Sequence, residues 1–507
     1  MKTPILGSSY VARSVNAADN RMINLFPEIV PEGGKEPAFL NRAPGLKLEV
    51  AVGTGPVRGM RTFNGFAYIA SGNTLYKIDS EYNITTLGLL ANDGPVSMTD
   101  DGTYLVAACN GPAFYYNSVT DTFGEITDTD FPGALTVSYL DGYFVFIEPD
   151  SQRVWVSELL DPTSIDPLSF ASAEGSPDGL VSSITDHSEV WLFGTNSVEV
   201  WYNSGALDFP LQRIQGAFNE IGCAATFSVA KLDNGLFWLG ADARGKGIVY
   251  RANGYTGLRI STHAVEWQIQ QYGDISDAIA YTYQQDGHSF YVLTFPTANA
   301  TWVYDVATQA WHERASFTNG NFGRHRSNCQ MAFNSKIIIG DYQNGNLYSF
   351  DLNVYADHNR VQKWLRSWRA LPTGANDLKR TAQHSLQLDA ETGVGLPGVV
   401  EIPGRVYLTP LIIVGDFYIN DEVVIITAVD DYVQPKVMLR WSDDGGHTWS
   451  NEYWRSMGGV GEYGTRVIWR RLGMTNKLRD RVYEVSGTDP VKIAIMGAEL
   501  QLSATNA

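Results

Sequence analysis

The sequence has few cysteines and no long apolar run, and each shortage excludes a class of protein. Three cysteines in 507 residues are too few for a disulfide-stabilised secreted scaffold. No stretch approaches the roughly 18 apolar residues of a membrane-spanning helix, and the first ten residues lack the apolar core of a signal peptide. We expect no membrane span, a reducing compartment of synthesis, and buried reduced thiols at Cys109, Cys223 and Cys329.

Basic residues are also scarce. The chain has 37 Lys and Arg against 55 Asp and Glu, a formal net charge of −18. A protein that grips DNA phosphates needs a basic surface, because release of counterions drives that binding. The chain as a whole is therefore a poor DNA clamp. An acidic wall would instead repel passing DNA without holding it, which suits a conduit.

Signatures of catalysis are missing as well. The sequence has no Gly-x-Ser-x-Gly elbow, no His-Glu-x-x-His and no phosphate-binding glycine loop that ends in Lys-Ser/Thr. Carboxylate pairs lie in turn-like sequence, where solvated turns are expected, and three histidines follow the spacing of a repeat without a ligand pattern. We predict a non-enzymatic protein with no catalytic, cofactor-binding or metal-binding residues; the groups considered are Asp100–Asp101, Asp430–Asp431, Asp443–Asp444, His288, His312 and His325.

Glycine and aromatic residues are abundant. The chain contains 49 Gly, 26 Tyr, 22 Phe and 13 Trp, with 44% hydrophobic and 18% charged residues. Turn formers combined with aromatic residues are what many short, twisted strands require. The balance of hydrophobic and charged residues is typical of a folded chain. The composition therefore predicts an all-β protein, and the length suggests about two to four domains.

The middle of the chain repeats a hairpin of two alternating apolar strands. Gly65–Ala70 and Thr74–Asp79 form the first copy, joined through a Ser-Gly-Asn turn. A shorter strand precedes each copy, and a weaker strand often follows it. The copies occupy residues 65–79, 104–117, 143–158, 190–203, 236–251, 289–305 and 336–351.

The spacing of these hairpins indicates a β-propeller. Successive copies begin 39 to 53 residues apart, and blades of four strands recur at roughly 40–50 residues. A series of sandwich domains would have a period nearer roughly 90–100 residues. We predict a propeller over residues 54–357, with seven blades favoured and six as the alternative.

The flanking segments differ from the repeat. Residues 1–53 read as an extended arm that packs on another domain or subunit. Residues 358–398 and 435–507 contain alternating strands and predict a β-sandwich or barrel-like ring domain, to which the arm contributes. Residues 399–434 carry two apolar runs around Asn420–Asp421 and read as an inserted small β subdomain.

A basic, tryptophan-bearing segment follows the last repeat. As a helix it would place Trp364 and Trp368 on one face with Val361 and Leu365; as a strand it would align Arg366 with the two tryptophans. Such a segment could stack on nucleic acid, but a solvated strand edge or a subunit contact is favoured.

One motif points towards an enzyme. Residues Ser442–Trp449 match the Asp-box of sialidases, Ser-x-Asp-x-Gly-x-Thr-Trp. The box is structural, because its aspartate caps a turn, its glycines supply unusual backbone angles and its tryptophan packs beneath. A sialidase would also need an arginine cluster and an activated tyrosine, and no spacing singles these out.

Motifs at both ends of the chain resemble the packaged-DNA stabilisation proteins of short-tailed bacteriophages, also called tail hubs, nozzles or tail accessory factors. The resemblance spans nearly the whole chain. The residues that carry it are Arg21–Glu28, Ala43–Leu46, Gln387–Gly395, Leu439–Ser450, Arg466–Gly473 and Asp480–Ser486. Residues 399–433 are where the chain departs from the shorter family pattern.

The resemblance implies a structural protein of the virion tail, made in the host cytoplasm. It implies a homohexameric ring below the portal and its adaptor ring that extends the channel for double-stranded DNA. It further implies retention of packaged DNA with a tail needle or plug, and an outer face for tailspikes or fibres. The family has no known catalytic residues, so none is carried over, and no cofactor is expected.

Two other functions stay open at this point. A propeller glycosidase of the sialidase type would show convergent carboxylates at one mouth of the propeller. A receptor- or glycan-binding tail protein would show exposed aromatic residues on the blade loops and a trimeric state.

Overall fold

The computed structural model describes residues 1–13, 19–31, 33–91, 93–173, 175, 178–242, 245–370, 379–395, 401–402, 405–406, 434–476 and 481–504. These residues form two compact units. One comprises Met1–Leu46, Ser316–Phe322 and Asp351–Ala507, and the other comprises Lys47–Ala315 and Gly323–Phe350. No helix in the described ranges is long and apolar enough to span a membrane.

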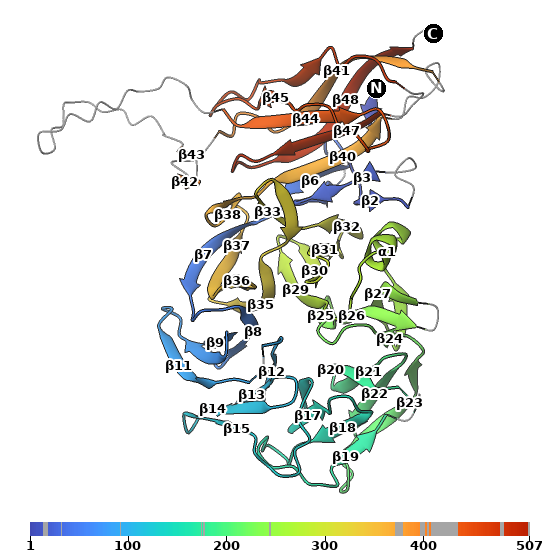
Figure 1. Cartoon of the computed structure of the whole chain (residues 1–507). Coiled ribbons are helices and arrows are strands. Elements are labelled where there is room, and N and C mark those ends of the chain that lie inside the picture. Colours follow the sequence, from blue (N-terminus) through green and yellow to red (C-terminus); the bar gives the residue numbers. More distant parts are fainter. Residues whose placement is uncertain are drawn as a thin grey trace, which may run out of the picture. The chain divides into compact units, whose positions relative to one another are not determined.

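The second unit is a β-propeller. In Figure 1 the strands from β8 to β37 form small sheets that follow one another around a common centre. Each sheet is a meander, and we call its strands A to D from the centre outward. The described strands form seven such blades, as the hairpin repeat predicts.

The strands of blades one to four are consecutive in the sequence. They are β8 (Val57–Phe63), β9 (Phe66–Ser71), β10 (Thr74–Ile78) and β11 (Ile84–Leu89); β12 (Ser97–Asp100), β13 (Tyr104–Ala108), β14 (Ala113–Asn117) and β15 (Thr122–Glu125); β16 (Val137–Leu140), β17 (Tyr143–Ile147), β18 (Arg153–Val156) and β19 (Phe170–Ser172); and β20 (Leu180–Asp186), β21 (Glu189–Gly194), β22 (Val198–Asn203) and β23 (Leu211–Asn219).

Blade five has a divided A strand, because two short strands both pair with β26. Its strands are β24 (Gly222–Cys223) with β25 (Ala230–Leu232), then β26 (Gly235–Asp242), β27 (Gly245–Asn253) and β28 (Thr256–Arg259). Blade six contains β29 (Ile279–Gln285), β30 (His288–Phe295), β31 (Ala300–Asp305) and β32 (Ala310–Glu313).

Blade seven is completed by a strand from the start of the chain. Strands β35 (Ser327–Phe333), β36 (Lys336–Asp341) and β37 (Asn346–Asp351) are its A to C strands, and β7 (Gly45–Ala51) is its D strand. The Ser349 hydroxyl donates to Glu49 Oε1 at 2.7 Å, and the Val52 amide donates to the Gly345 carbonyl at 2.7 Å. Residues 47–51 therefore belong to the propeller unit, whereas the sequence analysis placed them in the N-terminal arm.

The turns between A and B strands explain why the hairpins form. Asn64–Gly65, Asp141–Gly142 and Asp286–Gly287 have positive φ at both residues. This is the conformation of type I′ turns, whose twist matches that of the flanking strands and which Asn-Gly and Asp-Gly adopt with little strain. The repeat thus has a local cause at each of these turns.

Neighbouring blades bury their faces against each other. The B strand β17 is almost wholly buried, whereas the D strand β11 is largely exposed. Apolar clusters fill six of the seams between blades: one and two, two and three, three and four, four and five, five and six, and seven and one. These seams stabilise the ring because each apolar face is removed from water.

The first unit is a β-sandwich. One sheet has the order β46 (Val467–Arg470), β41 (Thr381–Ala390), β48 (Ala494–Ala504), β6 (Ala38–Arg42) and β5 (Leu25–Ile29), and β1 (Lys2–Thr3) also pairs with β48. The other has the order β4 (Met22–Ile23), β40 (Trp364–Ala370), β47 (Arg481–Gly487), β44 (Lys436–Ser442) and β45 (Tyr453–Ser456).

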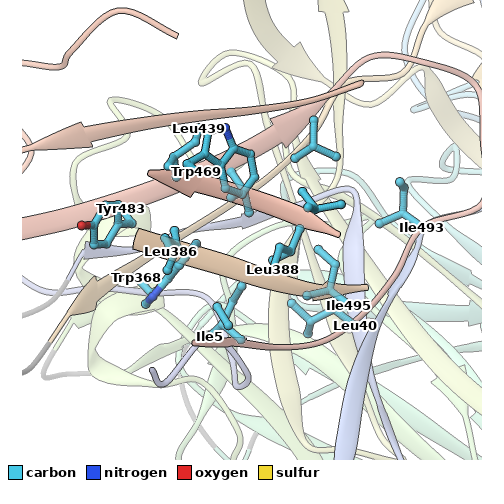
Figure 2. Packing of buried hydrophobic residues seen from close by; sticks show 14 of the residues in the cluster. Ile5, Leu40, Trp368, Leu386, Leu388, Leu439, Trp469, Tyr483, Ile493 and Ile495 are labelled. Carbon is cyan, nitrogen blue, oxygen red and sulfur yellow. The ribbon is translucent and has the colours of Figure 1, made fainter. Parts of the chain in front are cut away.

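The sandwich core draws on both ends of the sequence. Figure 2 shows Ile5 and Leu40 near Leu386, Leu388 and Ile495, side chains that are all buried. The N-terminal residues are therefore part of this core and supply strands to both of its sheets. The all-β prediction, with a propeller and a β-sandwich, is confirmed.

Short elements complete the description. Helix α1 (His263–Gln270) is the one helix in the described residues, and its N-cap Thr262 accepts a hydrogen bond from the Val265 amide at 3.4 Å. Most of the segment 399–434 lies outside the described residues. The remaining strands are β2 (Tyr10–Val11), β3 (Asp19–Asn20), β33 (Ala315–Thr318), β34 (Asn321–Arg324), β38 (Ala356–Asp357), β39 (Arg360–Val361), β42 (Glu401–Ile402) and β43 (Arg405–Val406).

Candidate functional site

The centre of the propeller contains a cavity of about 440 Å³ that is lined by the innermost segments of all seven blades. Its wall is mostly neutral and rich in hydroxyl groups. Ser183 Oγ lies 3.3 Å from Thr136 Oγ1 and 3.2 Å from Ser138 Oγ. The charged residues of its wall are Arg58, Arg61 and Asp100, and the last two form an ion pair at 2.7 Å. This arrangement shows no convergent carboxylates of the kind that a glycosidase uses.

The seam between blades six and seven differs from the apolar seams, because buried polar side chains meet there. Tyr281 of blade six donates to Ser327 Oγ of blade seven at 2.6 Å, and the His325 Nδ1 atom lies 2.7 Å from the same oxygen. Arg314 donates to the Tyr283 hydroxyl at 3.1 Å. The Tyr283 ring lies 4.9 Å from that of Phe350. Spacing in the sequence could not reveal this cluster, because its members come from strands of two blades.

The three histidines considered in the sequence analysis all lie in this part of the propeller. His288 Nδ1 lies 2.8 Å from Asp305 Oδ2, and Arg314 Nε lies 3.4 Å from His312 Nε2. Burial, together with the nearby Arg314 and Arg326 guanidinium groups, lowers the pKa of His325 to about 3. Burial also holds the pKa of His312 well below its usual value. Both imidazoles are therefore neutral at pH 7.

Within the described residues, no group of three or more His, Cys, Asp or Glu side chains is placed to hold a metal ion. Cys109 and Cys223 are buried thiols, and Cys329 is a partly buried thiol. Burial raises the pKa of the Cys223 thiol to about 11 and that of Cys329 to about 12. These thiols are protonated at neutral pH and are poor nucleophiles.

The Asp-box is a turn whose polar groups are used within the turn itself. Asp444 accepts hydrogen bonds from the Ser442 hydroxyl at 2.7 Å and from the Thr448 amide at 2.8 Å. The preceding Asp443 accepts two hydrogen bonds from the Arg481 guanidinium, at 2.6 and 2.7 Å. The carboxylates of this pair are therefore occupied in holding the turn, which is the structural role expected of the box.

The carboxylates of the pair Asp100–Asp101 are also occupied by neighbouring groups. Asp100 pairs with Arg61, and Asp101 accepts hydrogen bonds from the Thr103 and Tyr104 amides at 2.7 and 2.6 Å. The pair Asp430–Asp431 lies outside the described residues.

Within the basic, tryptophan-bearing segment, the residues Trp364–Ala370 form a strand, as one of the two alternatives predicted. Strand β40 is buried along its whole length between β4 and β47. The expected solvated edge is therefore wrong for this strand, and its buried side chains are not available for stacking on nucleic acid. Arg366 instead donates to the Ile5 carbonyl at 2.6 Å and to the Ser8 carbonyl at 3.5 Å. It holds the N-terminal residues in place.

Comparison with known proteins agrees with both folded units. Residues 1–355 match the family model described as "Bacteriophage P22 Gp10, beta-propeller", and residues 404–503 match the model described as "Bacteriophage P22 Gp10, beta-sandwich". The second match runs through residues 404–433, so most of the segment interpreted as an insertion lies within the matched range. No curated protein matches the chain.

Solved structures with similar chains are distant. A chain of the mitotic checkpoint complex is 12% identical with a TM-score of 0.40, and 60% of this chain and 94% of that chain are covered. The extracellular domain of a hybrid two-component system, BT4673 from B. thetaiotaomicron, is 11% identical with a TM-score of 0.41 and coverages of 70% and 44%. The designed protein Ika8 is 11% identical with a TM-score of 0.37 and coverages of 61% and 99%. Likenesses at this level carry no argument.

The family models cover most of the chain, and their two descriptions agree with the two units that the structure contains. The chain therefore belongs to the bacteriophage P22 Gp10 family of tail-hub and DNA-stabilisation proteins of short-tailed phages, and it is a structural protein of a phage tail.

Proposed function

We propose that the chain is the subunit of a homohexameric tail hub. The ring would lie below the portal and its adaptor ring and extend the channel for double-stranded DNA. It would retain the packaged genome together with a tail needle or plug, and it would mount tailspikes or fibres. The observation that carries this proposal is the family match, which includes both the propeller and the β-sandwich.

The charge of the chain supports a role as a conduit. A net charge of −18 disfavours tight binding to DNA phosphates. A channel wall of the same sign as DNA lets the genome pass without being held. On this proposal DNA is retained by closure of the channel with the needle or plug, and no sequence-specific contact to DNA is needed.

The geometry favours a structural role over catalysis. The Asp-box carboxylates are used within their own turn or by Arg481. Burial raises the pKa of Tyr281 and of Tyr283 above the ordinary tyrosine value, so neither hydroxyl is an activated nucleophile. These observations give no support to a glycosidase of the sialidase type.

The mass of the assembly tests the proposal. We expect light scattering of the purified chain, alone or mixed with the phage's adaptor ring, to give six copies of this chain. Negative-stain images of the mixture should show a six-fold ring with a central channel. A stable monomer or trimer that fails to bind the adaptor ring would contradict the proposal, and a trimer would favour a receptor-binding tail protein.

A further inference from the structure

In the propeller, the turns that join strands A to B and strands C to D lie on a single face. In an antiparallel meander, the A–B turn and the C–D turn lie at the same end of the blade. The innermost strands of a propeller all run in the same direction along its central axis. The A–B and C–D turns of successive blades therefore form one surface, which we call the turn face.

Hydrogen bonds between neighbouring blades show that these turns lie side by side. Asn64 Nδ2 in the A–B turn of blade one donates to the Gly102 carbonyl in that of blade two at 2.9 Å. His187 Nε2 of blade four lies 2.8 Å from Asn234 Oδ1 of blade five. Asn334 Nδ2 of blade seven donates to the Ser80 carbonyl of blade one at 2.9 Å. The turns are thus linked between blades one and two, four and five, and seven and one, and the common direction of the A strands places the turns of blades two to four on the same face.

Large aliphatic side chains project from this face on three consecutive blades. Val119 in the C–D turn of blade two is 80% exposed, and Leu159 and Leu160 in that of blade three are each 57% exposed. Leu207 in the C–D turn of blade four is fully exposed. The Leu160 amide donates to the carbonyl of Gly142, which places these leucines beside the A–B turn.

The backbone of Leu160, one of these exposed residues, is in a strained conformation. Its φ is 60°, in the left-handed region that a leucine rarely adopts. Such strain costs on the order of 1–3 kcal/mol and persists at sites where the surrounding structure enforces it, often sites of binding. Exposed apolar side chains grouped on one face are typical of contact surfaces.

The charge on the same turns determines which partner fits. The turns at 101–103, 118–121, 141–142, 157–160, 186–189 and 204–209 contain no Lys or Arg. Their exposed or partly exposed acidic residues are Asp101, Asp121, Asp141, Glu158, Glu189 and Asp208, whereas Asp186 is buried and pairs with Lys231 at 2.5 Å. An acidic rim around apolar side chains disfavours DNA and anionic lipid surfaces and attracts a basic protein surface.

We propose that the turn face of blades two to four is the docking surface for a second virion protein. That partner presents apolar sockets for Val119, Leu159, Leu160 and Leu207, surrounded by Lys and Arg side chains. The proposal rests on the chain's place in a phage tail and needs no hexameric ring.

Crosslinking inside assembled virions tests this assignment. A photoreactive phenylalanine derivative at position 119 or 207 should crosslink to one virion protein, at a peptide that contains Lys or Arg. The matched control is the same substitution at the exposed Leu258, which lies in a D strand and should not capture that protein. Crosslinks only to other copies of this chain, to DNA or to nothing would overturn the proposal.

Charge reversal separates this proposal from the ring. The variant D141K/D208K should weaken binding of the crosslinked protein by about tenfold or more, because two lysines would face the partner's Lys and Arg side chains and like charges repel. Its assembly mass should equal that of the parent, because both residues are exposed turn residues. Unchanged binding of the partner would contradict the docking surface. A parent chain that does not assemble into six copies would contradict the hexameric hub alone.

Discussion

Acid should weaken the propeller through the buried seam between blades six and seven. His325 is neutral and buried there, with the Arg314 and Arg326 guanidinium groups acting on it and Ser327 Oγ 2.7 Å from its Nδ1 atom. Its pKa is about 3 in the folded chain against about 6.5 in an unfolded one. Between these values the unfolded state binds the extra proton, so stability falls as pH falls below about 6.5.

The size of the effect follows from the two pKa values. Lowering the pH from 7 to 5 should reduce the free energy of unfolding by about 2 kcal/mol through His325 alone. His312 acts in the same direction, because burial also lowers its pKa. A loss of this size is a large fraction of the roughly 5–15 kcal/mol that holds a typical domain folded.

The variant H325Q isolates the contribution of this imidazole. Glutamine keeps a hydrogen-bonding group but does not titrate, so the acid-induced loss should shrink by about 2 kcal/mol. The measurement is denaturant unfolding followed by tryptophan fluorescence at pH 7, 6 and 5, with parent and variant compared so that other groups cancel. H263Q, which replaces an exposed histidine of the same unit, is the matched control variant. An equal difference in unfolding free energy between parent and H325Q at all three pH values would refute this role of His325.

Three further predictions follow from buried contacts. The variant R366M removes the guanidinium that donates to the carbonyls of Ile5 and Ser8. The free energy of unfolding of the sandwich should fall by at least about 3 kcal/mol, and a protease should cleave the N-terminal residues sooner than in the parent. The variant V52D buries a carboxylate in the cluster between blades seven and one; it should destabilise the propeller by at least about 3 kcal/mol, whereas a wild-type melting curve would contradict the role of that seam. The native chain should react slowly with a thiol reagent at pH 8, because burial raises the pKa of all three thiols. In urea all three thiols should become accessible and react. Rapid reaction of all three in the native state would contradict their burial.

The hairpins could be predicted from the sequence because their causes are local. Asn64–Gly65 and Asp141–Gly142 specify their own turns, and the alternating strands beside them follow with period two. The outer strand of blade seven could not be predicted in this way, since Glu49 and Ser349 are 300 positions apart and only the closed ring brings them together.

The buried polar seam between blades six and seven could not be predicted from the sequence for a similar reason. Tyr281, Arg314 and His325 each look like ordinary blade residues, and their contacts arise from the packing of two blades. Helix α1 was also missed, although Thr262 followed by Glu266 offers a capping residue and an acidic first turn. Burial of β40 between two other strands depends on the sandwich, and the alternation of Trp and Arg within it carries no sign of that environment.

The origin of β7 has a consequence for how the protein is made. Ribosomes synthesise this strand before any blade, yet its partner β37 is among the last propeller segments to emerge. Joining segments so far apart carries a loop-closure cost and slows folding. During synthesis β7 must therefore wait, unpaired, until the rest of the ring exists. A nascent chain that is stopped before residue 346 contains every earlier strand of the propeller but no partner to close it.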